Sequence, residues 1–271
     1  MKPRLLVFDL DGTLLAPDHK TVTERTALAL RLAHAQGAQL VIATGRTLNL
    51  TDEVTAQLPM IDWLILSNGA VLYDRARRSC LTRTLIPAAH TAQTAALLEG
   101  LPAFSNFYID GKVHTQREKL SYFYDLSMPE AFLDFFRHCM EFHTHLPAAA
   151  ALEQINVYSR DPAVGRTVLA AFEENGYTIS STMSGEMTAN AAGVNKGAAL
   201  RKLCDTLGLP LCAVAAFGDA GNDRDLLTLA GLGVAMGNAD AGCRAAADRI
   251  APTNAEDGVA AVLEDLLGSM C

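Results

Sequence analysis

The sequence is poor in the features that mark membrane-spanning, secreted and nucleic-acid-binding proteins. Its 22 lysines and arginines are outnumbered by 30 aspartates and glutamates, which gives a formal net charge of −8 and argues against a surface built for nucleic acid or anionic lipid. No apolar run approaches the roughly 18 residues that suggest a membrane span. Before Asp9 the apolar stretch is only Leu5 to Phe8, too short for a signal-peptide core. We therefore expect a cytoplasmic protein, monomeric or weakly dimeric, without nucleic-acid or membrane partners.

Paired cysteines are also lacking. The chain has six cysteines and no C-x-x-C pair, and a chain of 271 residues is too large to need disulfide staples. We expect reduced, mostly buried thiols at Cys80, Cys139, Cys204, Cys212, Cys243 and Cys271.

Apolar residues are plentiful, at 50% of the chain, and the length favours two domains over one. The N-terminal part alternates short apolar runs with a helical pattern. Strands are predicted at Leu5 to Phe8, Leu40 to Ala43 and Trp63 to Leu66, and a helix at Thr23 to Gln36 with Leu28, Leu32 and Ala35 on one face. The pattern is βαβαβ, typical of a parallel sheet.

The C-terminal part follows the same alternation. Helices are predicted from Lys196 to Leu207, from Asp223 onward and from Asp257 to Leu267, and strands at Ala213 to Phe217 and Gly233 to Met236. Both ends of the chain are therefore expected to build one α/β domain, a Rossmann-like doubly wound parallel sheet.

The middle of the chain, from Leu85 to Gly185, differs and indicates an inserted α+β domain. Asp110-Gly111 between two short apolar segments predicts a hairpin. Helices are expected at 129–142 and 164–174, and strands at 155–158 and 177–181. The expected domains are residues 1–84 and 186–271 for the core and 85–185 for the insertion.

The most informative motif is Asp9-Leu10-Asp11-Gly12-Thr13, which begins where the first predicted strand ends. Open α/β sheets bind their ligands at that edge. One carboxylate, Asp9, could attack phosphorus, while Asp11 donates a proton to the leaving oxygen and later takes one from water. The alternatives are an acidic turn or a piece of a calcium loop, but Leu14, Leu15 and Ala16 follow where a calcium loop needs further acidic residues.

Three other segments are placed for phosphate chemistry. Thr44-Gly45-Arg46 follows the second strand and offers a hydroxyl and a backbone N–H. Lys196 begins a predicted helix and could neutralise the transferring group.

The third segment, Gly218 to Asp223, follows another strand and supplies Asp219. Together with Asp9 and the main-chain carbonyl of Asp11, Asp219 would make a site for Mg²⁺, which prefers few carboxylates, several waters and a substrate phosphate. Each of these three segments alone is weak evidence for a phosphate site, because turns and surface lysines are common. All four nevertheless map to strand ends or helix starts of one sheet, which predicts a single shared site.

These four segments resemble the motifs of the haloacid dehalogenase (HAD) superfamily of phosphatases. The stretches Ser67 to Ala70 and Gly233 to Ala239 resemble its Cof-type branch. The resemblance implies a Rossmann-like core with a C2-type cap inserted between the second and third motifs, which agrees with the different middle section.

The resemblance also implies a role for each site residue. Asp9 would be nucleophile and metal ligand, Asp11 general acid/base and carbonyl ligand, and Asp219 the third metal ligand. Phosphate would be held by the Leu10 amide, Thr44, Gly45 and Lys196. Asn222 would contact the phosphate or orient Lys196, and Asp223 would support the metal ligands without touching the ion.

The expected activity is Mg²⁺-dependent hydrolysis of a small phosphate monoester, such as a sugar phosphate, through an aspartyl-phosphate. A phosphomutase using the same intermediate remains open, since the residues do not separate the two reactions. A non-catalytic phospholigand sensor is a further alternative, although such a protein would be expected to lose Asp9 or Asp11, and both are present. Carbon–halogen hydrolysis is disfavoured, because it needs neither the proton donor Asp11 nor the metal ligand Asp219.

Overall fold

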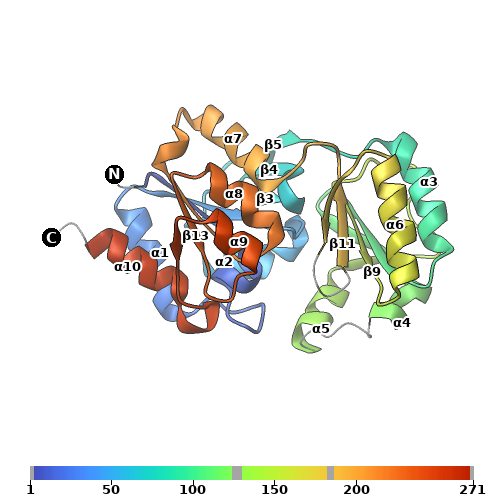
Figure 1. Ribbon diagram of the computed structural model, residues 1–271, viewed down its shortest axis with the longest axis horizontal. Helices are drawn as coiled ribbons and strands as arrows, with labels where there is room; N and C mark the ends of the chain where they lie inside the picture. The colour runs from blue at the N-terminus through green and yellow to red at the C-terminus, as the bar shows by residue number, and fades with distance from the viewer. Residues whose placement is uncertain (1–2, 124–129, 182–185, 269–271) are drawn as a thin grey trace. The chain divides into compact units, whose positions relative to one another are not determined.

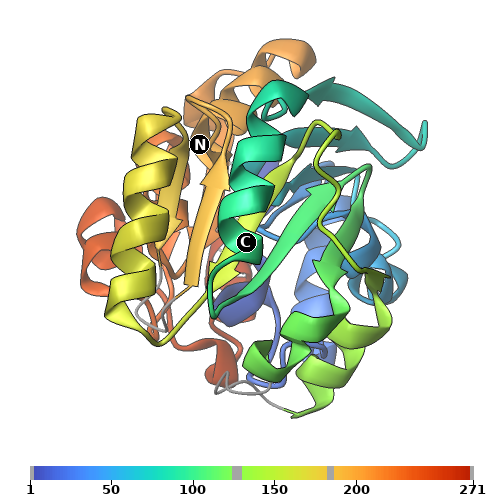
Figure 2. The same cartoon turned by 90° about the vertical axis from the view of Figure 1, so that its right-hand side faces the viewer.

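The computed structural model describes residues 3–123, 130–181 and 186–268, which form two compact units, each built on its own sheet (Figure 1, Figure 2). The core unit comprises Met1–Gly45, Thr51–Thr82 and Asn195–Cys271, and the cap unit comprises Arg46–Leu50 and Arg83–Val194. Nothing in the sequence indicated that the short stretch Arg46–Leu50 groups with the cap unit. Within the described ranges, no helix has both the length and the apolar character of a membrane span.

The core unit is an α/β fold around an eight-stranded sheet with the strand order β14-β13-β12-β1-β2-β3-β4-β5. Neighbouring strands from β14 to β3 run parallel, and β4 pairs antiparallel with β3. The predicted strands of both chain ends therefore do share one sheet. The strands are β1 (Leu5–Phe8), β2 (Gln39–Ala43), β3 (Trp63–Leu66), β4 (Val71–Asp74), β5 (Ser79–Arg83), β12 (Val214–Gly218), β13 (Leu232–Ala235) and β14 (Arg249–Ile250).

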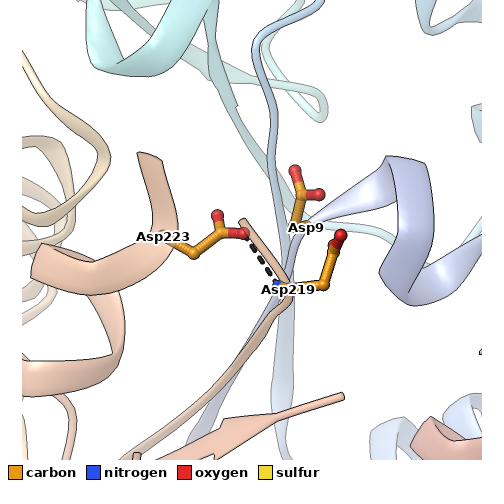
Figure 3. A group of neighbouring side chains, drawn as sticks. All are labelled: Asp9, Asp219 and Asp223. Atoms are coloured by element: carbon orange, nitrogen blue, oxygen red, sulfur yellow. Dashed lines mark hydrogen bonds between the residues drawn. The ribbon is translucent and has the colours of Figure 1, made fainter. Parts of the chain in front are cut away.

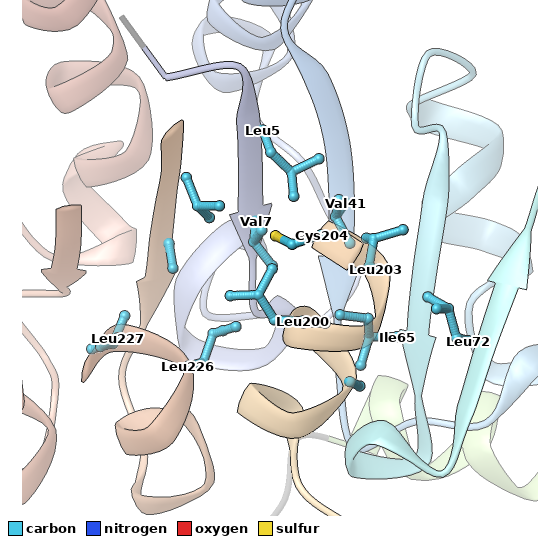
Figure 4. Packing of buried hydrophobic residues seen from close by; sticks show 14 of the residues in the cluster. Leu5, Val7, Val41, Ile65, Leu72, Leu200, Leu203, Cys204, Leu226 and Leu227 are labelled. Atoms are coloured by element: carbon cyan, nitrogen blue, oxygen red, sulfur yellow. The ribbon is translucent and has the colours of Figure 1, made fainter. Parts of the chain in front are cut away.

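In the part of the chain that the structure describes, six α-helices accompany this sheet: α1 (Glu24–Ala35), α2 (Asp52–Gln57), α7 (Lys196–Leu207), α8 (Arg224–Leu229), α9 (Ala241–Ala246) and α10 (Gly258–Gly268). The helices α7 and α8 cover one face, where alternate residues of each strand are buried against them (Figure 4). The residues of this packing include Leu5, Val7, Val41, Ile65, Leu200, Leu203, Leu226 and Leu227. This packing fixes the start of α7, which carries Lys196, against the sheet.

The predicted helix at Thr23 to Gln36 is confirmed, but its expected apolar face is wrong. Leu28 and Leu32 are 52% and 49% exposed, whereas Ala27, Leu30 and Ala33 are buried. The sequence contains apolar residues on several sides of this helix, so spacing alone could not tell which side packs. The helix α1 contacts α10 and the strand β2.

The cap unit is an α+β fold around a six-stranded sheet with the order β10-β11-β9-β6-β7-β8. All neighbours pair antiparallel except β7 and β8, which run parallel. Helices α3 and α6 lie along one face (Figure 2). The elements are α3 (Ala88–Glu99), β6 (Phe104–Ile109), β7 (Lys112–Gln116), α4 (Leu120–Phe123), α5 (Glu130–His138), β8 (Met140–His143), β9 (Gln154–Tyr158), α6 (Pro162–Glu174), β10 (Thr178–Ser181) and β11 (Glu186–Asn190).

The predicted hairpin at Asp110-Gly111 is confirmed, with both residues at positive φ. The predicted helix at 129–142 is wrong over its last part, and its first residue, Pro129, lies outside the described residues. The helix α5 ends at His138, and Met140–His143 form β8 instead. These four residues pair with the edge of β7, an interaction that the local pattern cannot reveal.

Candidate active site

Two of the predicted carboxylates meet because β1 and β12 are adjacent parallel strands. Phe8 pairs with Phe217, and the N–H of Asp9 donates to the carbonyl of Phe217 at 3.0 Å. Asp219 follows the end of β12, so both side chains leave the same edge of the sheet, as Figure 3 shows. Asp9, Asp219 and Asp223 each offer an oxygen within 4.8 Å of the others.

The turn after Asp9 is shaped to admit Asp219. Gly12 has φ of +83°, and a Cβ added there would lie 2.4 Å from Oδ2 of Asp219. The next residue, Thr13, donates its hydroxyl to Oδ1 of Asp219 at 2.7 Å. Gly12 and Thr13 therefore position the carboxylate of Asp219.

Lys196 lies at the centre of the cluster. Its helix begins at Asn195, whose side chain accepts the N–H of Ala198 at 2.7 Å and so caps α7. The fully buried Nζ of Lys196 donates to Oδ1 of Asp9 and to Oδ1 of Asp223, both at 2.6 Å. The predicted lysine is thus a buried partner of the carboxylates and not a solvated surface residue.

Asp223 is held from both sides. Besides Lys196, its carboxylate accepts the N–H groups of Asp219 at 3.0 Å and of Ala220 at 3.1 Å. These bonds fix the segment that carries Asp219.

The charges of this cluster do not balance within it. Burial raises the pKa of Asp9 well above its ordinary value; Lys196 opposes the rise and neighbouring carboxylates add to it. Burial, followed by the charge of Asp223, raises the pKa of Asp219 to about 7. Burial alone would lower the pKa of Lys196, but Asp223 and Asp9 hold it above its ordinary value.

A divalent cation fits this donor set. Three carboxylates face one ammonium, so the excess negative charge has a ready counter-ion in a metal. The donors are hard oxygens, the type that Mg²⁺ prefers. Asp9 and Asp219 would hold the ion, with Asp223 already committed to Lys196 and two backbone N–H groups.

The residues expected to hold phosphate form a neighbouring group. Thr44 is buried directly after β2, and a Cβ on Gly45 would lie 3.3 Å from Oδ1 of Asn68. The same Asn68 oxygen accepts Nδ2 of Asn222 at 2.9 Å. Leu10 is fully buried beside Asp9. Asn222 therefore contacts the Thr44 segment through Asn68.

Sequence reasoning missed several supporting residues. Asn238 donates to the carbonyl of Gly12 at 2.8 Å, and Asn254 donates to that of Leu15 at 2.8 Å. Asn68, whose φ is +53°, lies in the stretch Ser67 to Ala70, but no role in the site was predicted for it. A further residue, His19, lies with Nδ1 2.9 Å from Oδ1 of Asp11. Asn68 and Asn238 carried a sequence signal, because both lie in the stretches that resemble the Cof-type branch, whereas His19 and Asn254 carried none.

Comparison with known proteins identifies the family. Residues 6–263 match the family model of the haloacid dehalogenase-like hydrolases. The chain is 31% identical over 258 residues to a 5-amino-6-(5-phospho-D-ribitylamino)uracil phosphatase, YcsE, of Bacillus subtilis, covering 95% of this chain and 93% of that protein. It is 28% identical to the pyridoxal phosphate phosphatase YbhA of Escherichia coli, covering 96% and 97% of the two chains.

A solved structure of a sugar phosphatase of HAD subclass IIB superposes with a TM-score of 0.83 at 24% identity, covering 98% of this chain and 99% of that one. At that identity the likeness concerns the fold, a Rossmann-like core with an inserted α+β cap. The family match over nearly the whole chain and the similarity to these phosphatases establish that the chain is a phosphatase of the haloacid dehalogenase-like hydrolase family, of the Cof type.

Proposed function

We propose that the protein is a Mg²⁺-dependent phosphatase that hydrolyses a small phosphate monoester, a sugar phosphate or similar metabolite, through a phosphoryl group carried on Asp9. The observation that carries this proposal is the burial of Asp9 at a strand end, bonded to Lys196 at 2.6 Å and grouped with Asp219. A salt bridge kept solely for stability would not need a second and third carboxylate, because each adds repulsion.

In the first step an oxygen of Asp9 attacks phosphorus, and the bond from phosphorus to the ester oxygen breaks. Asp11 gives its proton to that leaving oxygen. The ammonium of Lys196, the hydroxyl of Thr44 and the N–H groups of Leu10 and Gly45 hold the phosphoryl oxygens, with Asn222 beside Thr44 through Asn68.

In the second step Asp11, now a carboxylate, takes a proton from water. The water oxygen bonds to phosphorus, the bond from phosphorus to Asp9 breaks, and inorganic phosphate leaves. When Mg²⁺ is bound, by Asp9, Asp219 and the main-chain carbonyl of Asp11, it offsets the repulsion between the carboxylates and the anionic substrate.

The relatives indicate a class of substrate for this protein and not an individual compound. One relative is named for a ribitylaminouracil phosphate and another for pyridoxal phosphate, and both are small organic molecules with one phosphate ester. We therefore propose a monoester of comparable size as the substrate.

The test combines an activity screen with chemical trapping. Purified protein is assayed against a few dozen phosphorylated metabolites with Mg²⁺ and with a chelator, and inorganic phosphate is measured. Acid-quenched protein from a reaction with radioactive phosphate donor is digested, and the label is located. Label on the Asp9 peptide with stoichiometric phosphate release supports the proposal. Transfer of the labelled phosphoryl group to another sugar hydroxyl, instead of its release as inorganic phosphate, would indicate a phosphomutase. Ligand binding without turnover would indicate a sensor.

A further inference from the structure

The loop after the first motif is built to hold one conformation. The carboxylate of Asp18 accepts the N–H groups of Lys20 and Thr21, each at 2.9 Å. Within the loop, the N–H of Ala16 donates to the carbonyl of Thr21 at 2.9 Å, and that of His19 to the carbonyl of Ala16 at 3.0 Å. These bonds close a tight turn that carries His19 at its tip.

The loop is also fastened to the helix α2 through one side chain. Gln57 accepts the N–H of Val22 at 2.9 Å and donates to the carbonyl of Lys20 at 2.9 Å. The chain on the C-terminal side of His19 therefore cannot shift without breaking bonds to a neighbouring element of the core unit.

His19 itself adopts an unfavourable backbone conformation. Its φ is +59°, in the left-handed region that residues with a side chain occupy at a cost in free energy. Such conformations persist where surrounding structure enforces them, and they concentrate at functional sites. In this conformation Nδ1 of the imidazole lies 2.9 Å from Oδ1 of Asp11.

We propose that His19 is a positioning residue for Asp11, fixing through this hydrogen bond the direction in which the Asp11 carboxyl group faces the ester oxygen. The inference rests on the proposed function, in which Asp11 is the general acid and base. A carboxyl group joined to its backbone by two rotatable bonds can face several ways, and only some place its proton within reach of the leaving oxygen. With a proton on Nδ1, donation from Nδ1–H to Oδ1 selects one of them.

The role has a specific signature in the dependence on the leaving group. An alkoxide, as released from a sugar phosphate, is a strong base and must be protonated as its bond to phosphorus breaks. p-Nitrophenolate is a weak base and leaves without a proton. A misdirected Asp11 should therefore slow the hydrolysis of sugar phosphates far more than that of p-nitrophenyl phosphate.

Two substitutions separate the hydrogen bond from the backbone strain. His19→Gly removes the imidazole and also relieves the positive φ, so any loss of activity does not come from strain. His19→Asn keeps an N–H donor at about the place of Nδ1, and asparagine tolerates positive φ better than most residues. Thermal melting of both variants checks that the fold is retained.

We expect His19→Gly to lower kcat/KM for a sugar phosphate about tenfold or more, and for p-nitrophenyl phosphate less than about twofold. His19→Asn should restore most of the loss. An equal loss on both substrates, no loss on either, or failure of His19→Asn to restore activity would overturn the positioning role.

Asp11→Asn, assayed beside these variants, distinguishes failure of this inference from failure of the proposed function. If Asp11→Asn is inactive on the sugar phosphate while His19→Gly is normal, only the role of His19 is wrong. If the wild type is inactive on every phosphate, or Asp11→Asn hydrolyses the sugar phosphate normally, the proposed function is wrong and the role of His19 falls with it.

Discussion

A glycine is needed between Asp11 and Thr13 for two separate reasons. Its φ of +83° is strained for any other residue, and a Cβ would collide with the Asp219 carboxylate at 2.4 Å. Gly37 offers a matched comparison, because its φ is +90° but a Cβ there would meet nothing within 4 Å. Strain and collision can therefore be measured separately.

We predict that Gly12→Ala and Gly37→Ala both destabilise the protein by about 1–2 kcal/mol, since alanine is forced into the left-handed region in each. Gly12→Ala should in addition lower kcat at least about 100-fold, because Asp219 must move. Urea unfolding and steady-state kinetics measure the two effects. Normal activity in Gly12→Ala would show that Asp219 is not held where the reaction needs it.

Asp219 also gives the metal-free protein a distinctive pH dependence. Burial, with Asp223, raises the pKa of Asp219 from 3.8 to about 7. Between these values the folded protein binds more protons than the unfolded chain, so this group lowers stability as pH rises and the loss is complete above pH of about 7. The slope contributed by Asp219 is at most about 1.4 kcal/mol per pH unit.

We predict that, with a chelator present, the free energy of unfolding of the wild type falls relative to that of Asp219→Asn between about pH 5 and about pH 8. Mg²⁺ should recover the lost stability of the wild type at the higher pH, because the ion binds the ionised form, and should affect the variant little. Urea titrations at both pH values provide the measurement. Parallel curves for the two proteins would contradict the assigned environment of Asp219.

At the scale of elements, the sequence predicted best where structure is decided locally. The strand at Leu5 to Phe8 and the helix Lys196–Leu207 are confirmed to the residue, since a continuous apolar run and a capped amphipathic pattern leave little choice. It failed at β8, which forms only because β7 offers an open edge. The buried side of α1 also depends on tertiary packing and was wrong for Leu28 and Leu32.

The site shows the same division. Asp9, Asp219 and Lys196 could be named because each follows a strand or starts a helix of one sheet. That Lys196 bonds Asp9 and Asp223, and that His19 reaches Asp11, depends on side-chain directions that spacing cannot give. Their roles in the reaction remain predictions.

The helix α7 has to place Lys196 at its first turn, and Asn195 fixes where the helix begins. We predict that Asn195→Ala destabilises the protein by about 1 kcal/mol and lowers kcat severalfold, because fraying of the first turn loosens Nζ from Asp9. Asp161→Ala is the matched control, since Asp161 caps α6 in the cap unit by accepting the N–H of Ala163 at 2.8 Å.

Thermal melting and kinetics of the two helix N-cap variants, Asn195→Ala and Asp161→Ala, provide the measurement. A similar loss of stability with a loss of activity only in Asn195→Ala would tie the start of α7 to the reaction. Equal effects on kcat would mean that general loosening, and not the placement of Lys196, is responsible.

At the scale of the whole molecule, the two units have separate hydrophobic cores joined by more than one stretch of chain. The stretch Arg46–Leu50 belongs to the cap unit, where Leu50 packs among its aromatic residues and the N–H of Asn49 donates to the carbonyl of Gly111 at 3.0 Å. Thr47 donates to the buried carboxylate of Glu153 at 2.8 Å. Because Gly45 immediately precedes this stretch, the proposed phosphate-binding segment is continuous in the chain with the cap unit.

The separate cores allow a test of how the work is divided between the units. The three clustered carboxylates, Asp9, Asp219 and Asp223, and the residues of the Asn68–Asn222 contact all belong to the core unit. We predict that replacing Arg83–Val194 by a short flexible linker, with Leu50→Ser to remove an apolar side chain that would lose its packing, leaves a folded core that still binds Mg²⁺. It should hydrolyse p-nitrophenyl phosphate while its preference among metabolites falls, since the cap unit's contribution to recognition is gone.

Calorimetric titration with Mg²⁺ and the ratios of kcat/KM over a metabolite panel measure these two properties, and Leu50→Ser in the full chain controls for the point substitution. Loss of Mg²⁺ binding in a core that retains its circular dichroism would place part of the metal site's support in the cap unit. Unchanged substrate ratios would place specificity in the core instead. Either result would contradict the predicted division, in which the core unit binds the metal and the cap unit sets the substrate preference. That division is expected because the carboxylates, Lys196 and the segment at Thr44 come from one sheet, which should fold without the insertion.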